Sequence, residues 1–427
     1  MGTRYALLPG SLDLIVSCQK IASLADEAPE GALRYELGVP VKPRNAEQTL
    51  ADGSADAKFA SALGGCAEGV KRSIDLPIET QVGCITEIEL SLRETMRAGP
   101  FDLQTHQRYF RQLPALSEIE LGGAEPHRDS ADGPVRVAVW NVERLRHIEA
   151  IGSLLARHQP DVILLSEVDK GMARSGNRHC LAELAGRLGH SFAYGVEFIE
   201  LDLGDQNEIL TSPGEQNLLG FHGNALISGL RLHRPFMVRL EADGGWFGPA
   251  RGQQRVGGRM AIGAQIEIGG VWVTFVSVHL ESNSSPIQRK AQVSHLLDVV
   301  ERYDGDAPLL IGGDFNTSTV DRTQDRDVEF RRTEFATDPM RLLDVEAHEP
   351  LFRELADRGF DWSASNVPGR PTERPQPDQP MRPLGKIDWI FTRGLRAVAP
   401  EIVPALDANG AYISDHDCLL VTVEPAG

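Results

Sequence analysis

The chain has 427 residues, of which 41% are hydrophobic and 24% are charged, a composition typical of globular proteins and not of disordered or fibrous ones. It carries 61 Asp and Glu against 43 Lys and Arg, so its net charge is -18 at pH 7. An acidic surface disfavours sequence-independent binding of duplex nucleic acid, although a nuclease with one local basic groove stays open. The length predicts two or three structural units or one large β-rich sandwich.

Residues 1–130 are expected to form a mainly helical N-terminal extension that carries no catalytic spacing. Within it, residues 78–99 (IETQVGCITEIELSLRETMRAG) are amphipathic with helical periodicity. Residues 127–134 (HRDSADGP) are polar and end in Gly-Pro, as linkers do. The roles left open for the extension are contact with another protein, dimerisation, gating of the catalytic part, and an inert extension.

From Val135 onward, short β-branched runs alternate with helical periodicity or turns. Helices are predicted at 142–159, 177–189 and 287–303. Strands are predicted at 135–140, 161–166, 260–268, 271–280, 308–313, 387–394 and 418–423. Six prolines within 367–384 predict an extended loop there. Strands mixed with a few helices favour a two-layer β core covered by helices.

The cysteines and the apolar segments indicate the compartment. The five cysteines are odd in number and lack CxxC spacing, which favours a reducing compartment over a disulfide framework or a zinc knuckle. The first residues, MGTRYALLPGSLDLIVS, lack the uninterrupted apolar stretch of a signal peptide. No later segment reaches the roughly 18 consecutive apolar residues of a membrane span. We therefore expect a cytoplasmic protein without a membrane span.

Polar residues gather just past the ends of the predicted strands. An acidic or amide group beside an apolar strand is costly to bury unless it is paired or binds a cation. Carboxylate and amide oxygens without thiolates suit Mg²⁺ or Mn²⁺ better than zinc. The residues concerned are Asn141, Glu143, Glu167, Asp169, His279, Asp314, Asn316, Asp388, Asp415 and His416. The pattern predicts one oxygen-rich site at one edge of the sheets.

Seven motifs in these positions are WNVE, LLSEVD, HGNALIS, SVHLES, GGDFN, IDWIF and SDHDCLL. In order and spacing, over about residues 135–424, they resemble the endonuclease/exonuclease/phosphatase superfamily of DNase I-like, metal-dependent phosphoesterases. The resemblance implies an α+β fold, a four-layer α/β/β/α sandwich with the site in a cleft at one edge. It makes 135–424 the catalytic domain and leaves the N-terminal extension unexplained.

The resemblance also implies a set of metal ligands and one residue that lines the cleft. Glu167 matches the principal metal carboxylate, and Asn141, Glu143 and Asp415 match further ligand positions. Asn224, in HGNALIS, matches a substrate-contacting residue only loosely. Glu143 has an ordinary alternative as an acid in the first turn of a helix, and Asn224 as a packed turn amide.

The remaining motif residues are implied to be catalytic. Asp314 and Asn316 match the pair that orients or deprotonates water and holds the phosphate. Asp388 and His416 match an Asp–His couple, in which the carboxylate fixes the tautomer and stabilises the imidazolium. His279 matches a phosphate-contacting position. Either Asp314 or His416 can take the proton; we expect Asp314 to orient the water.

The functional expectation is a Mg²⁺-dependent hydrolase of phosphodiesters or phosphomonoesters, nuclease-like or phosphatase-like, with Mn²⁺ as an alternative ion. Its substrate would be a nucleic acid, a phospholipid or a phosphorylated small molecule. The alternative is a non-catalytic module on the same fold that binds a phosphate ligand or a protein. Arg259 is expected to be structural or at the surface, although it could reach a phosphate.

Overall fold

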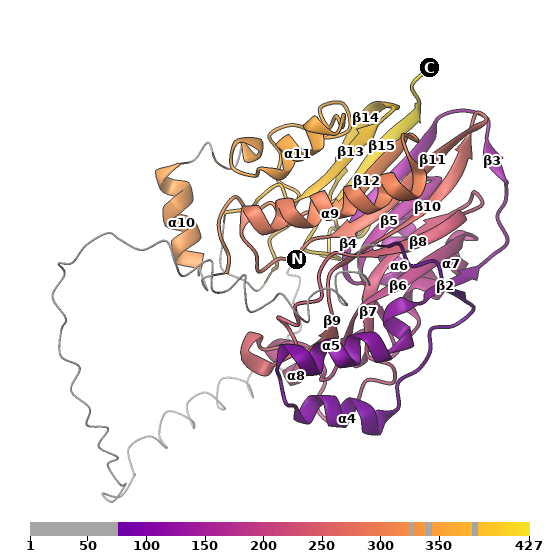
Figure 1. Cartoon of the computed structure of the whole chain (residues 1–427). Coiled ribbons are helices and arrows are strands. Elements are labelled where there is room, and N and C mark those ends of the chain that lie inside the picture. Colours follow the sequence, from indigo (N-terminus) through magenta and orange to yellow (C-terminus); the bar gives the residue numbers. More distant parts are fainter. Residues whose placement is uncertain (1–75, 324–327, 339–340, 342–343, 378–382) are drawn as a thin grey trace, which may run out of the picture. The chain divides into compact units, whose positions relative to one another are not determined.

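In the computed structural model, which describes residues 76–323, 328–338, 341, 344–377 and 383–427, two mixed β-sheets lie face to face (Figure 1). In spatial order the larger sheet contains β1 (Gln81–Val82), β2 (Ile119–Gly123), β6 (Ser191–Glu200), β7 (Phe221–Ser228), β5 (Val162–Lys170), β4 (Val135–Arg144), β15 (Cys418–Pro425) and β14 (Leu395–Val403), and β9 (Arg255–Gly257) pairs with β6. The smaller sheet contains β13 (Asp388–Arg393), β12 (Leu309–Asp314), β11 (Val271–His279), β10 (Met260–Ile268) and β3 (Ser130–Ala131), and β8 (His233–Arg239) pairs with β10.

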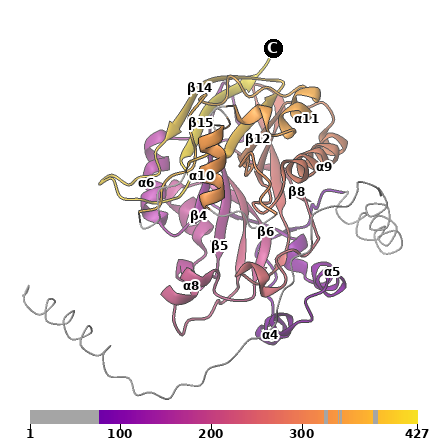
Figure 2. The ribbon, with the colours of Figure 1, turned by 90° about the vertical axis from the view of Figure 1, so that its left-hand side faces the viewer.

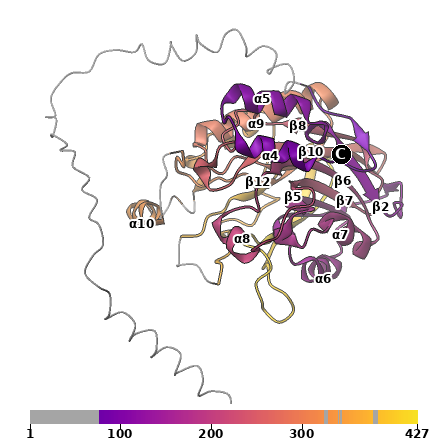
Figure 3. The ribbon, with the colours of Figure 1, turned by 90° about the horizontal axis from the view of Figure 1, so that it is seen from below.

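Three clusters of buried apolar side chains fill the spaces between four layers. One cluster joins the inward faces of the two sheets. A second lies between the larger sheet and the helices α6 (Ile148–His158) and α7 (Cys180–Leu188). The third lies between the smaller sheet and the helices α9 (Pro286–Asp304) and α11 (Leu351–Asp357). Figure 3 shows α6 and α7 on one side of the strands and α9 on the other. The predicted four-layer sandwich is confirmed.

In the part of the chain that the structure describes, four further α-helices lie outside these layers: α4 (Leu90–Ala98), α5 (Leu103–Gln112), α8 (Gln206–Thr211) and α10 (Val328–Thr337). Figures 1 and 2 place α4, α5 and α8 at the same lower end of the sheets. Tyr109 and Phe110 of α5 join the cluster beneath the larger sheet, and β2 pairs antiparallel with β6. The described residues before 131 therefore add strands and helices to the sandwich itself.

Three predicted helices begin later than expected, and the one predicted at 177–189 begins at Cys180. The helix predicted at 142–159 begins at Ile148, because residues 142–144 continue β4 and then turn sharply. Glu143, Arg144 and Leu145 have φ of 42°, 67° and 55°, a left-handed conformation that no α-helix allows. In the amphipathic segment 78–99, only α4 is helical, since its first part supplies strand β1.

The rest of the N-terminal extension, residues 1–75, lies outside the described residues, so its predicted roles stay predictions. In the Pro-rich segment, residues 378–382 also lie outside them. The described parts of that segment contain no helix and one isolated bridge, between Glu373 and His416. Among the described helices, none is both long and apolar enough to cross a bilayer.

Candidate active site

Three of the predicted catalytic residues stand side by side across the smaller sheet. In the register of its strands, His279 of β11 is opposite Asp314 of β12, and Asp314 is opposite Asp388 of β13. Gly313 permits this arrangement: its φ is 154°, and a Cβ there would lie 1.9 Å from the carbonyl oxygen of Val278. The GGD sequence therefore places the Asp314 carboxylate at the end of its strand, between two other polar side chains.

His416 completes this row from the loop before β15. Its Nδ1 lies 2.8 Å from Asp388 Oδ2, and its Nε2 lies 3.8 Å from Asp314 Oδ2. Burial alone would lower the pKa of His416, but the charges of Asp388 and Asp314 raise it well above its ordinary value. The imidazolium form is therefore favoured, with its orientation fixed by Asp388.

Asp314 is held by two amides. Its Oδ2 accepts a hydrogen bond from Asn141 Nδ2 at 3.1 Å, and its Oδ1 accepts one from the backbone N–H of Asn316 at 2.9 Å. Burial and the nearby charge of Asp388 raise the pKa of Asp314 above its ordinary value. A buried carboxylate with a raised pKa is a stronger base than an exposed one. The strand-end cluster is defined here as Asn141, His279, Asp314, Asp388 and His416.

A cation could bind within this cluster. One ligand atom from each of Asp314, Asp388 and His416 can be chosen so that all three lie within 4.8 Å of one another. Asp388 Oδ1 is buried and has no hydrogen-bond partner among the described residues. The sequence predicted a different ligand set, Glu167 with Asn141, Glu143 and Asp415, of which only Asn141 hydrogen-bonds to this trio.

Glu167 lies at a bulge of β5, where the register with β7 shifts between Leu165 and Val168 and its own φ is 58°. Its Oε2 pairs with Arg144 Nη1. Burial alone would raise the pKa of Glu167, but the charges of Arg144 and His279 hold it well below its ordinary value. Glu167 is therefore ionised, as a metal carboxylate must be.

Glu143 and Asp415 are joined to one another. Glu143 Oε2 accepts hydrogen bonds from Tyr412 Oη at 2.5 Å and from the backbone N–H of Asp415 at 3.1 Å, while its Oε1 pairs with Arg146. Burial and the charge of Glu167 raise the pKa of Asp415. Protein donors therefore already engage both carboxylate oxygens of Glu143. Asp415 lies close enough to Glu167 for the two carboxylates to interact electrostatically.

The two remaining predicted residues differ in position. Asn316 donates from Nδ2 to the carbonyl oxygen of Leu280 at 3.0 Å, next to His279 in the chain. Asn224 is fully buried on β7, and its Nδ2 donates to the Met260 carbonyl at 2.9 Å. Asn316 therefore belongs with Asp314, while the hydrogen bonds of Asn224 connect the two sheets and do not reach the strand-end cluster.

An ion-pair network behind His279 was not predicted. His279 Nδ1 lies 3.5 Å from Glu197 Oε2, and Arg259 bridges Glu197 and Glu281. Arg259 is only 3% exposed. Of the two expectations for this residue, a structural role and a surface position, the surface position is therefore wrong. The sequence did hold one signal, since Glu197 is an acid between apolar residues inside the strand SFAYGVEFIE and had to be paired there.

Beside Glu167 lies a cavity of about 240 Å³ that we name the arginine-lined cavity. Its wall also includes His222, Trp246 and Ser282. Five arginines line it, namely Arg144, Arg174, Arg251, Arg255 and Arg259. Three carboxylates, Glu167, Glu200 and Asp205, share this wall with the five arginines.

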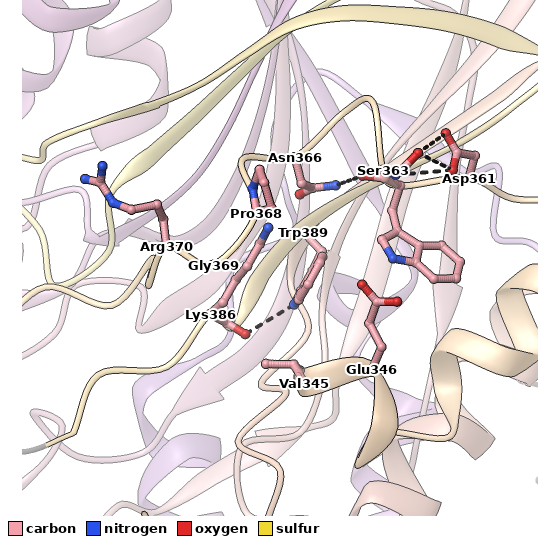
Figure 4. A pocket seen from close by; sticks show the side chains of 11 residues that line it. Val345, Glu346, Asp361, Ser363, Asn366, Pro368, Gly369, Arg370, Lys386 and Trp389 are labelled. Carbon is pink, nitrogen blue, oxygen red and sulfur yellow. Dashed lines mark hydrogen bonds between the residues drawn. The ribbon is translucent and has the colours of Figure 1, made fainter. Parts of the chain in front are cut away.

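A second cavity, of about 460 Å³, lies along β13 and is drawn in Figure 4. Lys386 Nζ lies 4.0 Å from the centre of the Trp389 ring and donates to the Val367 carbonyl at 2.8 Å. Burial lowers the pKa of Lys386 to about 8. Figure 4 shows the Glu346 carboxylate on the same cavity and Arg370 pointing away. None of the predicted catalytic residues lines this cavity.

Comparison with known proteins identifies a family. The sequence model of the Endonuclease/Exonuclease/phosphatase family matches residues 138–416, more than half of the chain. No curated protein matches the chain.

Three solved structures illustrate the structural similarity. An endonuclease/exonuclease/phosphatase from Beutenbergia cavernae DSM 12333 has a TM-score of 0.47 and 19% identity, covering 69% of this chain and 72% of that chain. The human Nocturnin catalytic domain with bound sulfate has a TM-score of 0.45 and 18% identity, covering 72% and 97%. An AP endonuclease from Archaeoglobus fulgidus has a TM-score of 0.42 and 14% identity, covering 67% and 98%.

Proposed function

The chain belongs to the endonuclease/exonuclease/phosphatase family, and from this premise we propose that it hydrolyses phosphoester bonds with the help of a divalent cation, Mg²⁺ or Mn²⁺. The observation that carries the proposal is the alignment of His279, Asp314 and Asp388 across three strands, with His416 held by Asp388 at 2.8 Å. A base, an oriented imidazolium and a second histidine on one edge are groups that can promote phosphoester hydrolysis.

The residues present fit a hard divalent cation. The donors around Glu167 are carboxylate and amide oxygens, and the low pKa of Glu167 keeps its carboxylate ionised. The buried Asp388 Oδ1, without a hydrogen-bond partner among the described residues, belongs to the other candidate ligand set, Asp314, Asp388 and His416. We propose Glu167 as the principal ligand through Oε1, since Arg144 engages Oε2, with Asn141 and Asp415 beside it. The part of Glu143 in this set stays a prediction. When bound, the ion would neutralise phosphate oxygen charge and stabilise the leaving oxygen.

The protein groups divide the proton chemistry. We propose that Asp314 orients the attacking water and accepts its proton, because burial raises its pKa towards the range in which a base works well. His416, whose raised pKa favours the imidazolium, would stabilise charge on the phosphate. Asp388 fixes the His416 tautomer, and His279 would contact the phosphate from the other side of Asp314.

The test is hydrolysis of a substrate panel by the full chain in Mg²⁺. The panel contains phosphomonoesters, phosphodiesters, plasmid DNA and abasic DNA, and Asp314→Asn prepared in parallel controls for contaminating phosphatases. We expect at least one substrate to be hydrolysed by the native chain and spared by the variant. No hydrolysis of any phosphoester, or equal hydrolysis by the variant, would contradict the proposal and favour a non-catalytic binding module.

A further inference from the structure

Three arginines of the arginine-lined cavity are neutralised within the protein. Arg144, Arg174 and Arg259 each form ion pairs with two carboxylates at 3.1 Å or less. Burial alone would lower their pKa values, but these carboxylates raise each of them above the ordinary value. Their positive charge is therefore used to hold the site together, and little of it is left for a ligand.

The other two arginines lack a close carboxylate partner, although Arg251 Nε donates to the side-chain oxygen of Asn283 at 3.2 Å. Arg255 is 7% exposed, and its ion pair with Glu200 spans 3.6 Å, beyond hydrogen-bond length. Its Nε has no hydrogen-bond partner among the described residues, and burial lowers its pKa. Arg251, at the rim, pairs with Glu281 at 3.8 Å. A buried cationic donor without a close partner is costly, and a bound anion would remove that cost.

An aromatic ring fixes both guanidinium groups in place. The Cζ atoms of Arg251 and Arg255 lie 4.8 Å and 4.4 Å from the centre of the Trp246 ring. Trp246 is itself anchored, because its Nε1 donates to Glu281 Oε2 at 2.9 Å. A planar guanidinium stacked on a ring keeps its donors directed and can bind phosphate oxygens in a bidentate manner.

Helix α5 and Phe101, which lies just before it in the chain, pack against the segment 246–257 that carries Trp246, Arg251 and Arg255. His106 Nε2 of α5 lies 3.0 Å from the carbonyl oxygen of Gly257, two residues beyond Arg255. Phe247, which directly follows Trp246 in the chain, packs edge to face against Phe101, with the ring centroids 5.6 Å apart. The loop is therefore preorganised, which reduces the entropy lost when a ligand binds.

We propose, on the basis of the hydrolase function above, that Arg251, Arg255 and Trp246 bind a second phosphate group of the substrate, a terminal phosphate monoester. The cavity includes Glu167, so this group would lie beside the scissile phosphoester. At about 240 Å³ the cavity is below the roughly 300–1,000 Å³ typical of pockets for whole ligands, so it has room for one group of the substrate. A phosphorylated small molecule and the 5′ end of a nucleic acid strand share this chemistry.

The experiment measures binding without turnover, by calorimetry of the full chain in EDTA. One pair of probes is adenosine 3′,5′-bisphosphate and adenosine 5′-monophosphate; the other is a short single-stranded oligonucleotide with and without a 5′-phosphate. Arg255→Gln and the rim variant Arg251→Gln are compared with Arg353→Gln, which removes one charge from an exposed side chain of α11. We expect the extra phosphate to tighten binding about tenfold or more in the native chain and in Arg353→Gln.

In Arg255→Gln and Arg251→Gln the gain in affinity from the extra phosphate should fall to about twofold or less. If Arg255→Gln, at the buried position, fails to fold, Arg251→Gln alone decides the test. An advantage only in the nucleotide pair identifies a small molecule as the source, and one only in the oligonucleotide pair identifies a nucleic acid end. No advantage in either pair, or one that both variants keep, overturns the proposal and leaves Arg255 a counter-ion of Glu200. Because these binding measurements need no hydrolysis, their outcome is independent of the hydrolysis assay that tests the proposed function.

Discussion

The strand-end cluster and the arginine-lined cavity are neighbours, but their charges are managed in opposite ways. Burial and the repulsion of nearby carboxylates raise the pKa values of Asp314, in the cluster, and of Asp415, beside it. Behind the cavity, Arg259 and other cations outweigh burial and lower the pKa of Glu197 to about 2. The first region holds two carboxylates, Asp314 and Asp388, against the His416 imidazolium, and this excess of negative charge suits a cation. The second is a network of buried ion pairs in which Arg251 and Arg255 lack a close carboxylate partner, which suits selection of an anionic substrate.

The largest effects should come from the cluster. Asp314→Asn and His416→Ala should each lower kcat by roughly 10²–10⁴-fold, the usual contribution of a general acid–base or orienting group. Steady-state kinetics on a responsive substrate, with circular dichroism to establish folding, provides the measurement. If His416→Ala kept native turnover, the Asp–His role would have to be abandoned.

A double-mutant cycle tests whether Asp388 acts through His416. Asp388→Asn should lower kcat about as much as His416→Ala, because an amide can hold the wrong tautomer of the ring. Groups that act as one unit give non-additive losses, so the double variant should be little worse than either single. The measurement is kcat for all four proteins at saturating Mg²⁺, and multiplicative losses would show that the two residues act separately.

The opposite pKa shifts predict opposite effects on stability. Glu197→Gln leaves Arg259 with a broken buried pair and should lower the free energy of unfolding at pH 7 by about 3 kcal/mol or more. The folded pKa of Glu197 is about 2, below its ordinary value, so this loss should shrink as the pH falls from about 4.3 toward 2. Asp314 has a raised folded pKa, so its ionisation opposes folding, and Asp314→Asn should be stabilising at pH 7.

Urea unfolding at several pH values measures these changes. Glu183→Gln, which breaks an exposed pair with Arg178, is the matched control and should cost about 1 kcal/mol or less. Equal losses in Glu197→Gln and Glu183→Gln would show that the network behind His279 is not the stabilising element described above.

A smaller effect separates the two candidate sets of metal ligands, the set around Glu167 and the set of Asp314, Asp388 and His416. Glu167→Gln should weaken Mg²⁺ binding by about tenfold or more, since even residues outside the ligand shell typically cost about 10–100-fold. Asp388→Asn should weaken it less, because Asp388 holds His416. Calorimetric titration with Mg²⁺ gives both affinities. The reverse order would place the ion among Asp314, Asp388 and His416 and remove Glu167 as the principal ligand.

The strand-end cluster could be predicted from the sequence because each of its residues belongs to a short contiguous motif at the end of an apolar strand. Once β11, β12 and β13 pair in order, His279, Asp314 and Asp388 must adjoin. The family and the four-layer fold, both inferred from these motifs, are confirmed.

The arginine-lined cavity could not be predicted in this way. Its arginines come from strand ends and loops between residues 144 and 259, and each role depends on which carboxylate the fold brings near it. The start of α6 was also missed, since the left-handed turn at Glu143–Leu145 interrupts a segment whose apolar spacing is helical. Charge pairing and a bulge are long-range outcomes that residue spacing alone does not encode.

The central claim is that the strand-end cluster hydrolyses phosphoesters only with a divalent cation, and one measurement tests it most directly. The rate of hydrolysis of a responsive substrate is followed in EDTA and after Mg²⁺, Mn²⁺ or Ca²⁺ is restored. We predict no activity in EDTA, recovery with Mg²⁺ or Mn²⁺, and little with Ca²⁺, whose looser coordination positions the phosphate less strictly. Full activity in metal-free buffer would contradict the account.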